Sequence, residues 1–214
     1  MMRRRDVLRL LSTASVATLG AACLVLVVGG LPDGSRDLRG ARRQVADALA
    51  ELAPYAAAHG VRLGVEPLHP MFCADRAVVS TLGQALDLTE GLAEGLAQGL
   101  TEPLPAAQVG VVVDTYHVWW DPAVETQIAR AAGRIAAYQV CDWSTPLPAD
   151  ALLGRGLMGD GHIDFGHLTA AVAATGYAGD VEVEIFNADI WATDPTIVMA
   201  RVVDRYREFI LTAL

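Results

Sequence analysis

An unbroken apolar run ends in a carboxylate in the stretch Val109-Gly110-Val111-Val112-Val113-Asp114-Thr115-Tyr116-His117. A run that is apolar at consecutive positions, rather than at every second one, is typical of a strand buried on both faces of a parallel sheet. Four further apolar runs lie at residues 23–28, 61–66, 135–140 and 181–185. The chain therefore contains five predicted strands of the type found in the interior of α/β proteins.

Helical patterns separate the predicted strands. They lie at residues 38–59, 80–100, 124–132, 165–175 and 195–214. In the first pattern, Pro54 is expected to kink or split the helix because proline removes a backbone donor. In the second, the glycine repeat at residues 91–100 predicts a loose surface segment. Strands that alternate with helices pair in parallel through right-handed crossovers. We therefore expect an α/β fold, with residues 1–214 forming a single domain.

The composition restricts the class of protein. Hydrophobic residues make up 53% of the chain and charged residues 19%, which excludes a disordered protein. The net charge of -9 and the scattered basic residues argue against a nucleic-acid partner, since binding to phosphates needs clustered Lys and Arg. Cys23, Cys73 and Cys141 lie far apart and suggest neither a thiolate zinc site nor a disulfide framework. A reducing compartment, the cytoplasm, fits best.

The N-terminal segment allows two interpretations. Arginines at residues 3–5 precede an uncharged stretch at residues 11–30, an arrangement typical of a twin-arginine export signal. The uncharged stretch is also long enough for a transmembrane helix. The alternative is an amphipathic helix followed by the predicted strand at residues 23–28, which ends at two glycines. We prefer this alternative, and with it a cytoplasmic protein without a membrane partner.

Oxygen-bearing side chains lie near the ends of four predicted strands. Glu66, Asp114 and Gln139 occupy these positions in the second, third and fourth strands. The fifth strand carries Glu182 and Glu184 on the same face, so either one could be its functional residue. Ligands bind at the carboxyl edge of parallel sheets, and buried carboxylates need a partner or a metal. These oxygens together predict a site for a hard divalent cation.

Four segments carry a resemblance to a known family. They are Val65-Glu66-Pro67-Leu68, Asp114-Thr115-Tyr116-His117, the loop at residues 155–165 and the strand region at residues 176–186. Their order and spacing resemble the xylose-isomerase-like superfamily of sugar phosphate isomerases and epimerases, which also includes inosose and dehydroshikimate dehydratases. The resemblance implies a (β/α) barrel of the TIM type. Family members begin with two strands and a helix that have no counterpart here, so we expect a barrel that is incomplete at its N-terminus.

The resemblance also implies a role for each candidate residue. The family's metal-ligand positions match four residues: Glu66, Asp114, Gln139 and Glu184. Gln139 stands where most members have histidine, and the implied metal is Mn, Mg, Co or Zn. Glu66 and Glu184 are also the implied catalytic residues, one removing the proton beside a carbonyl and the other returning it, through an enediolate. His117 and Arg155 match the family's substrate-binding positions.

The expected activity is that of a metal-dependent isomerase or epimerase acting on a small polyhydroxylated substrate, a sugar or sugar phosphate. A dehydratase of the dehydroshikimate or inosose type is one alternative, which Gln139 favours because some dehydratases have glutamine there. An exported or truncated, non-catalytic binding module is the other. We expect no organic cofactor, since no nucleotide-binding glycine motif follows a strand. A partner chain, for example a second copy in a homo-oligomer, could cover the exposed edge of the first strand.

Overall fold

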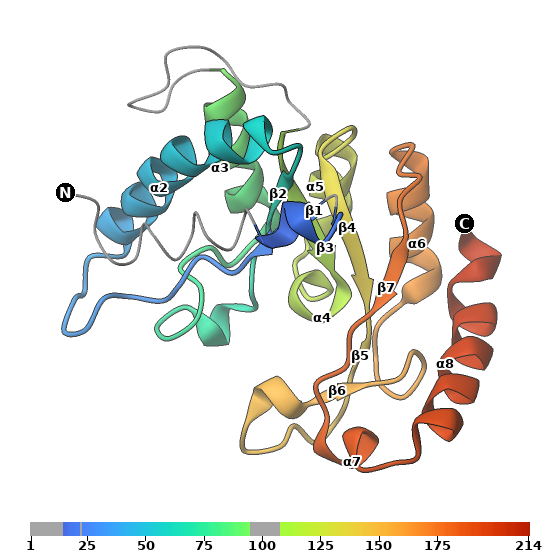
Figure 1. The fold of residues 1–214 in the computed structure, drawn as a ribbon. Coiled ribbons are helices and arrows are strands. Elements are labelled where there is room, and N and C mark those ends of the chain that lie inside the picture. Colours follow the sequence, from blue (N-terminus) through green and yellow to red (C-terminus); the bar gives the residue numbers. More distant parts are fainter. Residues whose placement is uncertain (1–14, 22, 95–107) are drawn as a thin grey trace. The chain divides into compact units, whose positions relative to one another are not determined.

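The computed structural model of the protein describes residues 15–21, 23–94 and 108–214. The main strands are β1 (Cys23–Leu26), β2 (Arg62–Val65), β3 (Val109–Asp114), β4 (Ile135–Val140) and β7 (Val181–Val183). They form one sheet in the order β1-β2-β3-β4-β7 (Figure 1), and the pairs β1–β2, β2–β3 and β4–β7 are parallel. The predicted α/β class and the five predicted strands are therefore confirmed.

Two compact units divide the chain. The first comprises residues 1–112 and 133–137, and the second comprises residues 113–132 and 138–214. The division crosses β3 and β4, so each of these strands contributes residues to both units.

The first unit contains α2 (Leu38–Ala58) and α3 (Leu82–Ala93), which pack on each other, and residues 15–18 are also helical. Pro54 lies inside α2, which continues for another turn, so the prediction that the helix splits at this proline is wrong. The reason is tertiary packing, because Ala53 and Ala56, on either side of the proline, are fully buried. Burial of this face holds the helix together in spite of the missing backbone donor.

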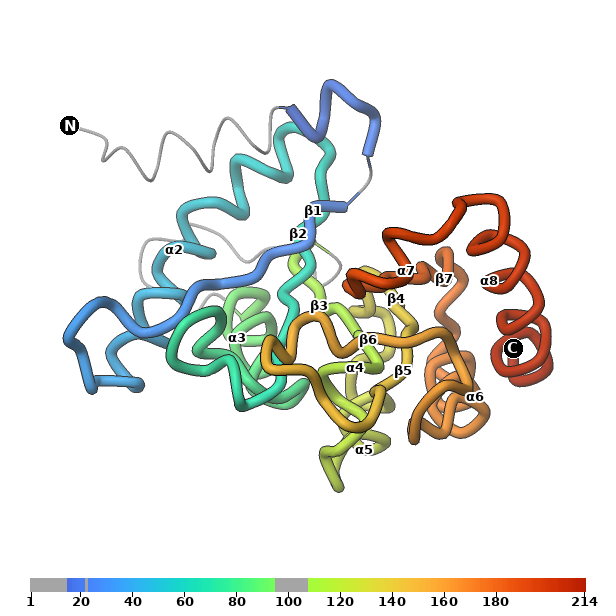
Figure 2. The backbone as a smooth tube through the Cα atoms, turned by 90° about the horizontal axis from the view of Figure 1, so that it is seen from below, coloured from blue at the N-terminus to red at the C-terminus, as the bar shows by residue number. Residues whose placement is uncertain are grey.

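The second unit contains five helices among its described residues: α4 (Thr115–Val118), α5 (Val124–Arg130), α6 (Phe165–Ala174), α7 (Ala188–Trp191) and α8 (Pro195–Phe209). A 3-10 turn, η3 (Leu211–Ala213), follows α8, so the last helix is shorter than predicted. α6 packs against α5 and against η3 (Figure 2). The short helices α4 and α7 have no counterpart in the sequence prediction, because a single turn has too few residues to show a helical period.

A two-stranded antiparallel pair lies close to the end of β4. It joins β5 (Asp142–Trp143) to β6 (Arg155–Gly156), with Asp142 opposite Gly156 and Trp143 opposite Arg155. β6 forms the beginning of the segment at residues 155–165, which is predicted from the sequence to be a loop. The pairing matters for function because it brings Arg155 close to the residues that follow β4.

Some predictions for the chain's polar and low-complexity segments fall outside the described ranges. The arginines at residues 3–5 lie there, as do residues 95–100 of the glycine repeat. Within the described ranges, no helix is both long enough and apolar enough to cross a membrane. Residues 23–26, inside the uncharged N-terminal stretch, form β1, as the strand interpretation predicts.

Candidate functional site

Asp114 ends β3 and begins α4. One carboxylate oxygen, Oδ1, accepts the backbone N–H of Tyr116 at 2.9 Å and so caps the helix. The other, Oδ2, lies 2.8 Å from Nη1 of Arg155. The side chain is fully buried. Because one oxygen is used by the cap, the second is the one available to a cation.

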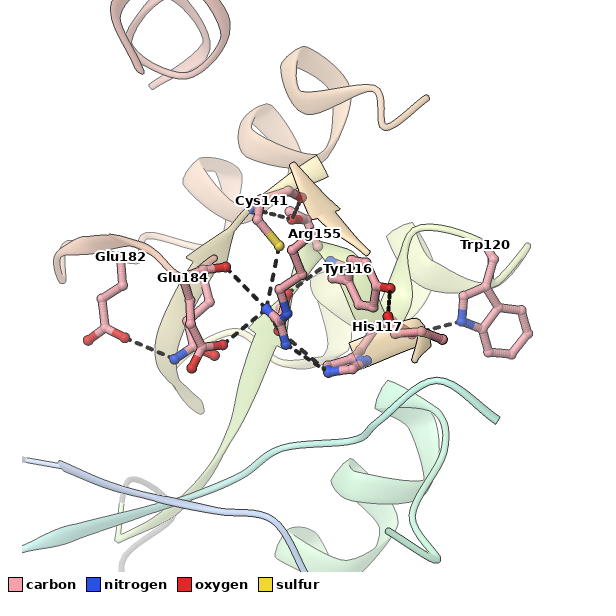
Figure 3. A network of polar contacts seen from close by, with 11 residues as sticks. Tyr116, His117, Trp120, Cys141, Arg155, Glu182 and Glu184 are labelled. Carbon is pink, nitrogen blue, oxygen red and sulfur yellow. Dashed lines mark hydrogen bonds and ion pairs between the residues drawn. The ribbon is translucent and has the colours of Figure 1, made fainter. Parts of the chain in front are cut away.

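Arg155 lies at the centre of a buried network of polar contacts (Figure 3). Its Nη1 donates to Oδ2 of Asp114 at 2.8 Å and to Oε2 of Glu184 at 3.0 Å. Its guanidinium carbon lies 4.8 Å from the ring centroid of Tyr116 and 5.1 Å from that of Phe186. Only 2% of Arg155 is exposed. One buried cation therefore contacts two carboxylates, one at the end of β3 and one just after β7.

The charge balance at Arg155 shows in its pKa. Burial by itself lowers the pKa of the guanidinium, but Asp114, Cys141 and Glu184 raise it, and the net direction is above the ordinary value. Burial also raises the pKa of the Cys141 thiol, whose sulfur lies 3.4 Å from Nη1 of Arg155. Arg155 therefore remains a cation, and Cys141 is an uncharged thiol beside it.

His117 lies in α4, one turn after Asp114, and is 1% exposed. Its Nε2 lies 3.1 Å from Nη2 of Arg155. A guanidinium can only donate, so Nε2 accepts this hydrogen bond and the ring proton lies on Nδ1. The same Nε2 lies 3.7 Å from Oδ2 of Asp114, but an accepting nitrogen makes no ion pair with a carboxylate. His117 and Asp114 are thus linked through Arg155.

Glu184 follows the last residue of β7. Its backbone N–H donates to the carbonyl of Val140 at 3.3 Å, which extends the β4–β7 ladder by one step. Burial raises the pKa of the Glu184 carboxyl, and Arg155 offsets only part of this effect. The side chain is 33% exposed.

Gln139 presents an unsatisfied oxygen in the same unit. Its Nε2 donates to Oε2 of Glu182 at 3.0 Å, and the two residues face each other across the β4–β7 pairing. Its Oε1 is buried and has no partner among the described residues. Only 5% of Gln139 is exposed. An acceptor left alone in this way costs free energy, about 1–3 kcal/mol, unless a ligand satisfies it.

The oxygen atoms of these side chains are suitable ligands for a hard divalent cation. Carboxylate oxygens of Asp114 and Glu184 converge on one positively charged atom, and the amide oxygen of Gln139 has no partner of its own. Such oxygens are the ligands that Mg and Mn prefer, and they are acceptable to Zn and Co. The structure therefore brings together Asp114, His117, Arg155 and Glu184 by direct contacts in the second unit. Gln139, in β4 of the same unit, contacts Glu182.

Glu66 belongs to the first unit. It directly follows β2, and its backbone N–H donates to the carbonyl of Leu26 at 3.1 Å, continuing the β1–β2 ladder. It is 5% exposed. A glutamate that is this deeply buried at a strand end is typical of a paired or metal-binding carboxylate.

Asp142 has a structural role that was not predicted from the sequence. Its buried carboxylate accepts four backbone N–H groups at 2.7–3.1 Å, three of them from the glycine-rich loop that follows β6. The sequence does contain a signal for this contact, since Asp142 comes directly after the apolar run of β4, as the other strand-end carboxylates do. Asp142 thereby holds the segment that carries Arg155 against β5.

The chain is similar to known proteins in sequence and in structure. The model of the xylose isomerase-like TIM barrel family matches residues 3–201. No curated protein matches the chain. Protein SMc04130 from Sinorhizobium meliloti 1021 is 46% identical with a TM-score of 0.85, and the match covers 96% of this chain and 70% of that one.

Two more distant structures share the fold. The IOLI protein, whose crystal structure holds a zinc atom, is 19% identical with a TM-score of 0.76, covering 97% of this chain and 69% of that one. An L-ribulose 3-epimerase is 22% identical with a TM-score of 0.72, covering 98% and 68%. Because the family model spans nearly the whole sequence and the observed strands alternate with helices as that fold requires, the chain belongs to the xylose isomerase-like TIM barrel family.

Proposed function

We propose that the protein is a divalent-metal-dependent isomerase or epimerase acting on a small polyhydroxylated substrate, a sugar or sugar phosphate. The observation that carries the proposal is the convergence of Asp114 and Glu184 on one cationic atom, and a buried Gln139 oxygen in the same unit has no described partner. The epimerase and the zinc-bound protein among the structural relatives support it.

The proposed ligands are Glu66, Asp114, Gln139 and Glu184. We include Glu66 because it matches a ligand position in the family resemblance and is buried directly after β2. A divalent cation bound to these residues would polarise a substrate carbonyl. With their charges met in this way, Asp114 and Glu184 no longer depend on Arg155, whose donors become available to substrate oxygens.

The proton transfers fall to Glu66 and Glu184. One carboxylate removes the proton on the carbon beside the polarised carbonyl, and the other delivers a proton to the product. His117 and Arg155, in contact with each other, hold substrate hydroxyl or phosphate oxygens.

Gln139 favours a second candidate, a dehydratase that uses the same proton abstraction and then expels water. Its neutral amide oxygen is a weaker metal ligand than the histidine nitrogen found at this position in most members of the family. Product analysis separates the two activities, because an isomerase or epimerase keeps the substrate's composition whereas a dehydratase loses one water.

The test begins with metal content. Elemental analysis of purified wild type, after addition of Mn and removal of excess, is expected to give about one equivalent, and Glu184→Gln is expected to lose it. Glu125→Gln, which removes an exposed carboxylate in α5, is the matched control and should keep the metal. Loaded protein should then exchange substrate protons with deuterium in D2O. A folded wild type without metal would contradict the proposal.

A further inference from the structure

We infer that Glu182 is a positioning residue, which holds the Gln139 amide so that its carbonyl oxygen faces the proposed cation. The inference rests on the proposed function, which gives Glu182 no role of its own. Figure 3 shows Glu184 turned toward Arg155, whereas Glu182 makes a separate contact. Glu182 in β7 and Glu184 just after it, two residues apart on one face, therefore have different partners.

The sheet register builds the contact between Glu182 and Gln139. The two residues are direct partners in the parallel pairing of β4 with β7, and Nε2 of Gln139 donates to Oε2 of Glu182 at 3.0 Å. Their neighbours Tyr138 and Val140 are held in the same ladder, opposite Val181 and Val183. The register therefore places the two side chains opposite each other, within reach of this hydrogen bond.

An amide bound to a carboxylate has one favoured orientation. The carboxylate of Glu182 can only accept, so it must meet the NH2 end of Gln139, and the flipped amide would oppose two oxygens. The favoured orientation turns Oε1 away from Glu182. That oxygen is buried and lacks a partner among the described residues. The structure therefore fixes a ligand atom with its lone pairs free, at the cost of an unsatisfied acceptor.

The alternative, that Glu182 is itself a ligand and Glu184 a neighbour, fits the contacts less well. Oε2 of Glu182 is occupied by the Gln139 amide, whereas Oε2 of Glu184 meets the same cationic atom as Asp114. Glu182 is also exposed on β7, and Glu184 is partly buried. A carboxylate outside the converging group can still orient a ligand, as carboxylates beside metal-bound histidines do.

The test is a double-mutant cycle on Mn binding, measured by titration calorimetry with MnCl2. Glu182→Gln keeps the size of the side chain and a hydrogen bond to Gln139, but an amide at this position accepts either orientation of its partner. It should weaken Mn binding about tenfold, the effect of one orienting hydrogen bond. In a Gln139→Glu background there is no amide to orient, so the same substitution should change the affinity by less than about threefold.

The outcomes separate this inference from the proposed function. A wild type that binds Mn, with Glu182→Gln weakening binding only when Gln139 is present, supports the inference. If Glu182→Gln weakens Mn binding equally in the wild-type and Gln139→Glu backgrounds, Glu182 acts only as a nearby negative charge. This result overturns the inference but leaves the proposed metal site standing. Unchanged binding in Glu182→Gln overturns it as well. A wild type that binds no Mn removes both. Glu125→Gln serves as the control for loss of one remote negative charge.

Discussion

Asp142→Asn tests whether one buried carboxylate holds the loop that carries the site. Oδ1 of Asp142 accepts the N–H groups of Trp143 at 2.7 Å and Ile163 at 3.1 Å. Oδ2 accepts those of Gly159 at 2.9 Å and Gly161 at 2.8 Å. Asp142 is 1% exposed, so water does not compete for these donors. The substitution changes one oxygen to an NH2 group and leaves the shape of the side chain almost the same.

The magnitude follows from the number of bonds lost. Asparagine keeps one acceptor oxygen and turns its NH2 group toward two N–H donors, so two hydrogen bonds to a charged group disappear. Each is worth about 1.5–3 kcal/mol, which gives a loss in the free energy of unfolding of about 3–6 kcal/mol. The remaining two bonds also weaken because their acceptor is no longer charged.

Urea denaturation measures the effect, with Asp150→Asn as the matched control. Asp150 is exposed and accepts a single N–H, that of Leu152, at 3.1 Å, so its substitution should cost no more than about 1 kcal/mol. Hydrogen exchange in the wild type gives a second measurement, since the amides of Gly159 and Gly161 should be protected. A loss below about 1 kcal/mol for Asp142→Asn, or rapid exchange of both glycine amides, would refute the reasoning.

Three further results are expected. Gly159→Ala should lower the free energy of unfolding by about 2–5 kcal/mol, because Gly159 has φ +88 and an added Cβ would lie 2.3 Å from the ring of Phe209 in α8. Gly176→Ala is the control: Gly176 has φ +79 but open space around it, so the loss should be about 1–2 kcal/mol. Glu125 raises the pKa of exposed His167 through a 2.8 Å contact. The pair therefore stabilises the folded protein below the pKa that His167 has in the unfolded chain, and this stabilisation is lost as the pH rises through the pKa of His167 in the folded protein. An NMR titration should show a lower His167 pKa in Glu125→Gln. Arg155→Met should destabilise the protein by about 3–5 kcal/mol, and added Mn should recover part of the loss in thermal unfolding.

The strands and the strand-end residues could be predicted because their signals are local. The apolar run at residues 109–114 is buried at every position, as its consecutive pattern requires. Parallel strands put their carboxyl ends at one edge of a sheet, so the neighbouring positions of Asp114 and Gln139 at strand ends follow from topology. The same rule for strand ends predicts Glu66 as a site residue, and Glu66 is buried.

The contacts around Arg155 could not be predicted, because they depend on tertiary structure. A two-residue strand such as β6 has no period to detect, and its pairing with β5 joins residues separated by a loop. The choice between Glu182 and Glu184 also needs the register, since the two residues are two positions apart and point to the same side. Pro54 shows the opposite case, a strong local signal that tertiary packing overrides.

Arg155 reduces the repulsion between the two carboxylates of the candidate site, Asp114 and Glu184. Asp114 and Glu184 each have an oxygen within 3.0 Å of Nη1, so their charges would repel each other strongly in a buried setting if that atom were neutral. The fold thus needs a cation there, and Arg155 supplies one. A divalent ion on the same oxygens would meet repulsion from the guanidinium, so Arg155 must move or the ion must bind weakly. The free energy of metal binding therefore includes the cost of releasing Arg155, and a substrate oxygen that accepts from the released guanidinium would offset that cost. Metal and substrate are then expected to bind cooperatively, each more tightly in the presence of the other.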